Sequence, residues 1–139
     1  MAGGALVGVD ASVVIKWFKA EAYSEDALRL RDDYVSRSVD VASVELLPFE
    51  VLNALRWNPT VDADTLRRAS GALHGYGLWL HTLEGELAEH IVENSLARGI
   101  TIYDSSYLSL GEVMRYLSTQ RTGSSWRRPA AIPSTTLSV

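Results

Sequence analysis

The sequence contains no cysteine, so neither disulfide bonds nor thiolate-bound structural zinc can hold the chain together. It also lacks a basic segment ahead of its first apolar stretch, which Asp10 interrupts, and this excludes the pattern of a secretory signal peptide. No apolar run is long enough to cross a membrane. We therefore expect a protein of the reducing cytoplasm with no membrane partner.

Acidic residues are missing from the end of the chain. All 17 of them lie within residues 1–112, which also hold 9 basic residues and so carry a net charge of −8. Residues 113–139 hold four arginines and no acid. The length of 139 residues and the hydrophobic share of 47% fit one globular domain with a substantial core. We therefore divide the chain into a folded domain at 1–114 and an atypical basic tail at 115–139.

Apolar periodicity predicts strands that alternate with helices. Three short apolar runs are typical of buried strands: 5–9, 39–44 and 78–80. Helices are predicted at six places: after a cap at Ser12, from Ser24, at 45–57, from Asp62 or Asp64, at 84–98 and at 103–116. This alternation favours an α/β fold with a central parallel sheet, whose ligands bind beyond the carboxyl ends of the strands. The helix at 45–57 is apolar nearly all round, so we expect it to be central.

Three carboxylates stand where a strand ends or a helix offers an apolar face. Asp10 follows the first strand, Glu50 shares a helix face with leucines and Asn53, and Asp104 begins the last helix. Carboxylates gathered at one edge repel each other unless a cation lies between them, and Mg²⁺ or Mn²⁺ takes oxygen ligands. The three together predict a divalent metal site.

Each carboxylate also has a purely structural explanation. Asp10 and Asp104 are good N-cap residues, and capping alone would account for them. Glu50 can be a buried glutamate whose charge is satisfied by a hydrogen bond to Asn53. The prediction of a site therefore depends on the set and not on any single member.

Each carboxylate lies in a short motif. The three motifs are VDASV at 9–13, FEVLNAL at 49–55 and GITIYDSSYLSL at 99–110. In this order and spacing, over roughly 6–114, they resemble the acidic motifs of PIN-domain nucleases, and most closely those of the VapC-like toxin ribonucleases of toxin–antitoxin modules. The resemblance implies a PIN-like three-layer α/β/α fold around the parallel sheet.

The resemblance also implies an activity and its partners. PIN-domain toxins are Mg²⁺- or Mn²⁺-dependent endoribonucleases that hydrolyse RNA phosphodiester bonds, so Asp10, Glu50 and Asp104 would be both the catalytic and the metal-binding residues. A homodimer and a cognate antitoxin protein across the active groove are implied in the same way. Polar neighbours within the motifs are candidates to orient a carboxylate or a metal-bound water: Ser12, Asn53 and Ser105.

The last third of the chain departs from the family pattern. A fourth aspartate is expected after a strand there, yet residues 115–123 read RYLSTQRTG and contain no acid. Read one base earlier, from the last base of the Arg115 codon, permitted codons for this segment spell Val-Pro-Leu-Tyr-Thr-Ala-Asp. We therefore hypothesise that a one-base loss replaced the native ending, and the bases at these codons test the idea.

Two other interpretations stay open at this point. The basic tail can be a nucleic-acid arm in which Arg121, Arg127 and Arg128 contact RNA phosphates. The domain can also be a catalytically impaired PIN-like module that binds a protein partner and lacks the fourth acidic residue.

Overall fold

A small parallel sheet organises the protein. The computed structural model describes residues 5–19 and 24–120. Its three strands are β1 (Leu6–Gly8), β2 (Asp40–Val44) and β3 (Trp79–His81), and they lie in the order β1-β2-β3. Both pairings are parallel, with Val7 opposite Val41 and Ser43 opposite Leu80. The predicted α/β class and its three strands are confirmed, each to within about two residues.

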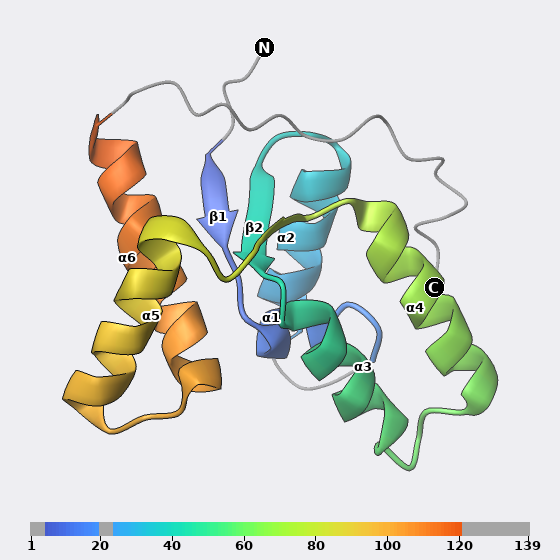
Figure 1. Cartoon of the computed structure of the whole chain (residues 1–139). Coiled ribbons are helices and arrows are strands. Elements are labelled where there is room, and N and C mark those ends of the chain that lie inside the picture. The colour runs from blue at the N-terminus through green and yellow to red at the C-terminus, as the bar shows by residue number, and fades with distance from the viewer. Residues whose placement is uncertain (1–4, 20–23, 121–139) are drawn as a thin grey trace.

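Helices cover both faces of this sheet (Figure 1). They are α1 (Ala11–Ile15), α2 (Glu25–Val35), α3 (Leu47–Arg56), α4 (Ala63–Tyr76), α5 (Gly85–Arg98) and α6 (Ile102–Gln120). The pair α5 and α6 lies on one side, and α1 to α4 lie on the other (Figure 1). This arrangement is compatible with the three layers that the sequence predicts.

Side chains alternate across β2 and so divide the interior into two cores. Val41 packs with α1 to α4, while Val44 packs on the opposite face with α5 and α6. The larger core is built around Val14, Trp17, Tyr34, Val41, Leu47, Val51, Leu55 and Tyr76. The smaller core consists of Val44, Leu87, Ile91, Leu110 and Val113. Period-two alternation in a strand explains why both faces are apolar.

Local signals place most helix ends correctly. Asp62 caps α4, because its Oδ1 accepts a hydrogen bond from the Thr65 N–H at 2.7 Å. Gly99 ends α5 in a left-handed conformation with φ of 65°, which glycine adopts without steric cost. The last helix is longer than expected, since α6 continues to Gln120. The rest of the predicted tail, 121–139, lies outside the described residues.

The expectation that the helix at 45–57 is central is wrong. Leu47, Val51 and Leu55 are each 0% exposed, but Phe49 is 75% and Trp57 is 70% exposed. One side of α3 therefore enters the larger core, and its other side carries aromatic rings to the surface. An apolar composition allows a helix to be buried, but the elements packed around the helix decide how much of its surface is covered.

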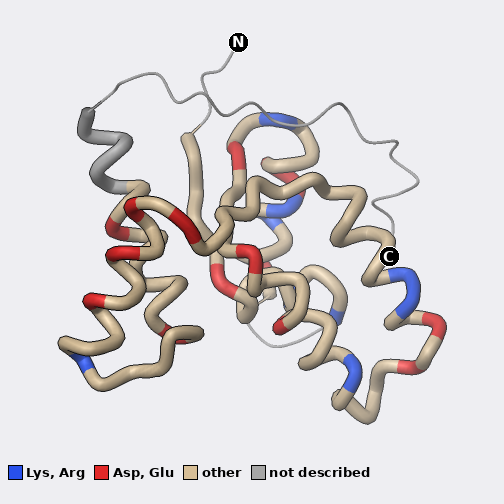
Figure 2. The backbone as a smooth tube through the Cα atoms, viewed as in Figure 1, with Lys and Arg blue, Asp and Glu red and all other residues tan. Residues whose placement is uncertain are grey.

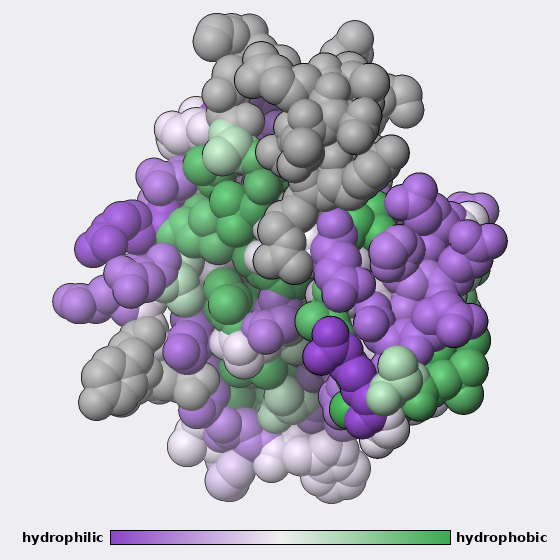
Figure 3. Space-filling view, turned by 90° about the vertical axis from the view of Figure 1, so that its left-hand side faces the viewer, coloured by the Kyte–Doolittle hydropathy of each residue, from purple (hydrophilic) through white to green (hydrophobic). Residues whose placement is uncertain are grey.

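The opposite side of the molecule also carries apolar side chains to the surface. The face with α5 and α6 shows green apolar patches among polar residues (Figure 3). On α5, Val92 is 44% and Leu96 is 75% exposed. No helix among the described residues is both long and apolar enough to cross a membrane.

Candidate functional site

The end of β1 is held in place by the middle strand. The Val9 N–H donates to the carbonyl oxygen of Ala42 at 3.0 Å, and the buried Ser43 hydroxyl donates to the Val9 carbonyl oxygen at 2.7 Å. The residue that follows, Asp10, therefore leaves the sheet at its carboxyl edge. This is the edge at which ligands bind in open parallel sheets.

Asp10 caps α1 and also accepts a hydrogen bond from Ser12. Its Oδ1 accepts from the Val13 N–H at 3.3 Å and from the Ser12 hydroxyl at 2.6 Å. The expected cap at Ser12 is wrong, because the cap is Asp10 and the helix begins at Ala11, two residues earlier than a cap at Ser12 would place it. The Ser12 hydroxyl therefore makes the hydrogen bond that is needed to orient the Asp10 carboxylate.

Glu50 is joined to the other side of the sheet by Tyr107. It lies half-buried in the first turn of α3, and the Tyr107 hydroxyl donates to its Oε1 at 2.5 Å. Glu50 is thus satisfied by a hydrogen bond, as the structural alternative expects, but the donor is Tyr107 and not Asn53, whose Oδ1 accepts from the Trp57 Nε1–H at 3.1 Å. A contact between residues 57 positions apart therefore satisfies Glu50.

Asp10 and Glu50 both affect the pKa of the Tyr107 phenol. Burial raises the pKa of Tyr107 well above its ordinary value of 10.0, and its hydrogen bond to Glu50 raises the pKa further. The negative charges of Glu50 and Asp10 contribute in the same direction. Asp10 and Glu50 come from different segments, and both raise the pKa of the Tyr107 phenol, which therefore stays protonated.

Asp104 lies in the first turn of α6 but does not cap it. Its N–H donates to the Thr101 Oγ1 at 2.9 Å, so Thr101 takes the capping position and the capping explanation for Asp104 is wrong. The side chain is exposed and precedes Tyr107 by three residues, which places both on one side of the helix. Capping is therefore no longer a reason for an acid at this position.

Ser105 faces away from the carboxylates. It is 0% exposed, and its hydroxyl donates to the Ile91 carbonyl oxygen of α5 at 2.7 Å. A weaker contact of 3.4 Å joins it to Ser109 on the next turn. The structure therefore uses this hydroxyl to pack α5 against α6.

The donor chemistry of the predicted site suits a hard divalent cation, since all three residues offer carboxylate oxygens. Within residues 5–19 and 24–120, no group of three or more His, Cys, Asp or Glu side chains stands in a position to hold a metal ion. Glu50 is hydrogen-bonded to Tyr107, the charge of Asp10 makes the smallest contribution to the raised pKa of that phenol, and Asp104 lies one helical turn before it. The three-ligand site stays a prediction.

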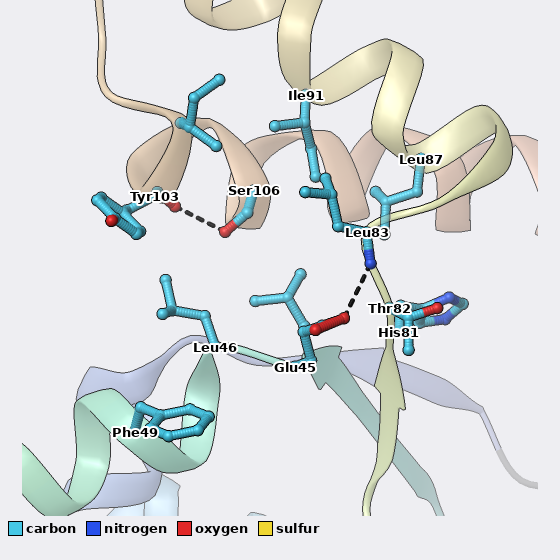
Figure 4. A pocket seen from close by; sticks show the side chains of 12 residues that line it. Glu45, Leu46, Phe49, His81, Thr82, Leu83, Leu87, Ile91, Tyr103 and Ser106 are labelled. Atoms are coloured by element: carbon cyan, nitrogen blue, oxygen red, sulfur yellow. Dashed lines mark hydrogen bonds between the residues drawn. The ribbon is translucent and has the colours of Figure 1, made fainter.

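An apolar pocket opens beside this edge (Figure 4). Its volume is about 250 Å³, and it lies between the start of α3, the end of β3 and the facing sides of α5 and α6. Leu46, the residue before α3, and Phe49 of α3 line it on one side, while Tyr103 and Ser106 line it from α6 (Figure 4). The Leu83 N–H donates to the Glu45 Oε2 at 2.9 Å across its floor. No local sequence pattern predicts this pocket, because its walls come from four separate segments.

A wider groove runs between α3 and α4. Its volume is about 730 Å³, and its lining residues are Phe49, Glu50, Leu52, Asn53, Arg56, Leu66, Arg67 and Ser70. Glu50 lies at the end of the groove nearest the carboxyl edge, since it occupies the first turn of α3. The groove therefore opens onto the predicted site.

Tyr107 is the residue whose role the sequence analysis missed. Tyr107 lies in the third motif, three positions after Asp104, but no neighbouring residue in the sequence indicates that its hydroxyl reaches α3. No protein-family model and no curated protein matches this chain.

Proposed function

We propose that the chain is a PIN-like, metal-dependent endoribonuclease of the toxin type, which hydrolyses RNA phosphodiester bonds. One observation carries the proposal: the Tyr107 hydroxyl binds Glu50 of α3, and the charge of Asp10, which follows β1 at the carboxyl edge of the sheet, also raises the pKa of that phenol.

The residues have distinct parts in this proposal. Asp10, Glu50 and Asp104 would hold Mg²⁺ or Mn²⁺, which supplies an activated water and neutralises charge on the phosphate. Ser12 fixes Asp10 through its 2.6 Å hydrogen bond, and Tyr107 fixes Glu50 by occupying its Oε1. The second oxygen of Glu50, Oε2, would then be a ligand for the cation.

The test uses purified protein, a structured RNA and a gel readout. We expect cleavage with Mn²⁺, none with EDTA, and a loss of about 100-fold or more in Asp10→Asn, because a metal ligand is removed. Asp26→Asn is the matched control, since Asp26 is an exposed α2 carboxylate that pairs with Arg29 at 3.0 Å. Equal cleavage in all samples would point to a contaminant and end the proposal.

A second candidate is a catalytically impaired PIN-like module that binds protein. Two findings favour it: the described residues contain no ready three-ligand group, and the pocket beside the edge is apolar. No cleavage by the wild type under any metal condition, with intact folding, would select this candidate. The same assay therefore separates the two functions.

The proposed partners besides RNA are a cognate antitoxin and a second copy of the chain. The apolar pocket suits a peptide that carries large apolar side chains. The exposed Leu96 and Val92 on α5 suit a symmetric contact. Leu96→Glu would lower the molar mass measured by light scattering if α5 forms that contact, and an unchanged mass would exclude it.

A further inference from the structure

The apolar pocket beside the carboxyl edge adjoins the smaller core. Val44, Leu87 and Ile91 belong to that core, are almost fully buried, and also line the pocket. Leu83 and Tyr103 line it as well but are mostly exposed, so they stand at its mouth. The volume of about 250 Å³ exceeds the roughly 150 Å³ of a cavity that holds one benzene molecule. The space therefore fits a molecule of about two fused rings.

Two polar side chains in the wall already have partners within the protein. The Ser106 hydroxyl donates to the Tyr103 carbonyl oxygen at 2.6 Å, and the Glu45 Oε2 accepts from the Leu83 N–H at 2.9 Å. Because these groups are paired, an apolar molecule can lie against them without leaving a new polar group unsatisfied. The wall therefore favours an occupant that is apolar over most of its surface.

One polar atom has no partner. His81 lines the pocket from the end of β3 (Figure 4), and its Nε2 is buried without a hydrogen-bond partner among the described residues. The Trp79 ring packs against the imidazole, with centroids 4.3 Å apart and planes at 32°, and restricts its rotation. Burial lowers the pKa of His81 below its ordinary value of 6.5, so the ring is neutral at pH 7. An occupant that supplies the missing hydrogen bond gains stability from it.

Charge restricts the occupant further. Asp10 follows β1 and Glu45 follows β2, and Figure 2 shows acidic segments at these carboxyl ends of the strands. An anion is repelled there, and any ion loses its hydration against an apolar wall. A hydroxyl both donates and accepts, so it can pair with Nε2 whichever ring nitrogen of His81 carries the proton. An uncharged ring system with one hydroxyl group meets all of these conditions.

We propose that the apolar pocket is a binding site for a small uncharged phenol of about two fused rings. Its rings lie against Val44, Leu87 and Ile91, and its hydroxyl pairs with the Nε2 of His81. This inference is independent of the proposed ribonuclease function. It adds a small-molecule ligand to a pocket that also suits an apolar side chain of a peptide.

The test uses NMR spectroscopy of the isotope-labelled full chain at pH 7. The probes are 5-indanol, a neutral phenol with two fused rings, and indane, which has the same rings and no hydroxyl. We expect 5-indanol to shift the amide resonances of Leu87 and Ile91 saturably, with a Kd of about 1 mM or lower. Indane should bind about fivefold more weakly, because it lacks the hydrogen bond. Partition out of water alone would give the opposite order, since indane is the more apolar compound.

Two variants locate the binding. His81→Phe keeps a ring against Trp79 and removes Nε2, so 5-indanol should lose its advantage over indane. Leu83→Trp fills the mouth and should abolish saturable binding of both compounds. Val35→Trp is the matched control, since Val35 is an exposed apolar residue of α2 that does not line the pocket, and it should change Kd by less than about twofold. Circular dichroism confirms that each variant is folded, and His81→Leu serves if His81→Phe does not fold.

Three results would overturn the proposal. The first is shifts that grow linearly with concentration and are alike in Leu83→Trp and Val35→Trp, since these show unspecific adsorption. The second is wild-type binding of indane that equals or exceeds that of 5-indanol, or an advantage of 5-indanol that persists in His81→Phe, since either shows that Nε2 does not meet the occupant. The third is no binding of either compound, which would leave the pocket to the side chain of a protein partner.

Discussion

Removing the Tyr107 hydroxyl is the most direct test of how the site is assembled. The ring packs against both cores, and the hydroxyl donates to the Glu50 Oε1 at 2.5 Å. Tyr107→Phe keeps the apolar ring and deletes only this bond. A hydrogen bond to a charged group contributes about 1.5 to 3 kcal/mol.

The lower end of that range applies, because Glu50 is half-buried and water can replace the phenol. We therefore expect Tyr107→Phe to lower the free energy of unfolding by about 1.5 kcal/mol, or the Tm by about 5 °C. Urea unfolding followed by circular dichroism measures this difference. Tyr103→Phe is the matched control, since this ring on the same helix is 62% exposed, and it should change stability by less than about 0.5 kcal/mol.

A double-mutant cycle with Glu50→Gln isolates the contact itself. We expect a coupling energy of about 1 kcal/mol, because a neutral amide accepts the hydrogen bond more weakly than a carboxylate does. If Tyr107→Phe and Tyr103→Phe are equally stable and the coupling is near zero, then Tyr107 does not hold Glu50. The convergence of the acidic motifs would then lose its main support.

Three further predictions concern the scaffold. Ser43→Ala should destabilise by about 1 to 3 kcal/mol in urea unfolding, because the buried Val9 carbonyl loses its donor, and an unchanged midpoint would contradict the contact. Gly99→Ala should lower the free energy of unfolding by about 1 kcal/mol, as measured by thermal unfolding. The cause is the φ of 65° alone, since no atom lies within 4 Å of the added Cβ, and an unchanged stability would show that α5 ends differently. The pKa values of Tyr107 and Tyr76 are raised above the ordinary value of 10.0, so the stability that this shift contributes is fully present below about pH 10 and is lost as pH rises above it. Urea midpoints should therefore fall as the pH rises above about 10, and less steeply in Tyr107→Phe.

Part of the candidate site was predictable and part was not. The positions of Asp10 and Glu50 near the carboxyl edge follow from the strand–helix order, because residues that follow parallel strands meet at one edge. The partner of Glu50 does not follow, since a hydroxyl 57 residues away competes with the nearby amide of Asn53 and forms the bond. Local spacing cannot rank a near partner against a distant one.

The sequence by itself determined the alternation of strands and helices and the αL end of α5 at Gly99, and it narrowed the cap of α4 to Asp62 or Asp64. These features depend on backbone sterics and on neighbours a few positions away. Only the tertiary structure decided that one side of α3 stays exposed and that Ser105 turns toward α5. The physical reason is that the rotation of a helix about its axis is fixed by what it packs against. That same rotation places Tyr107 against Glu50 and leaves Arg56 beside an open groove.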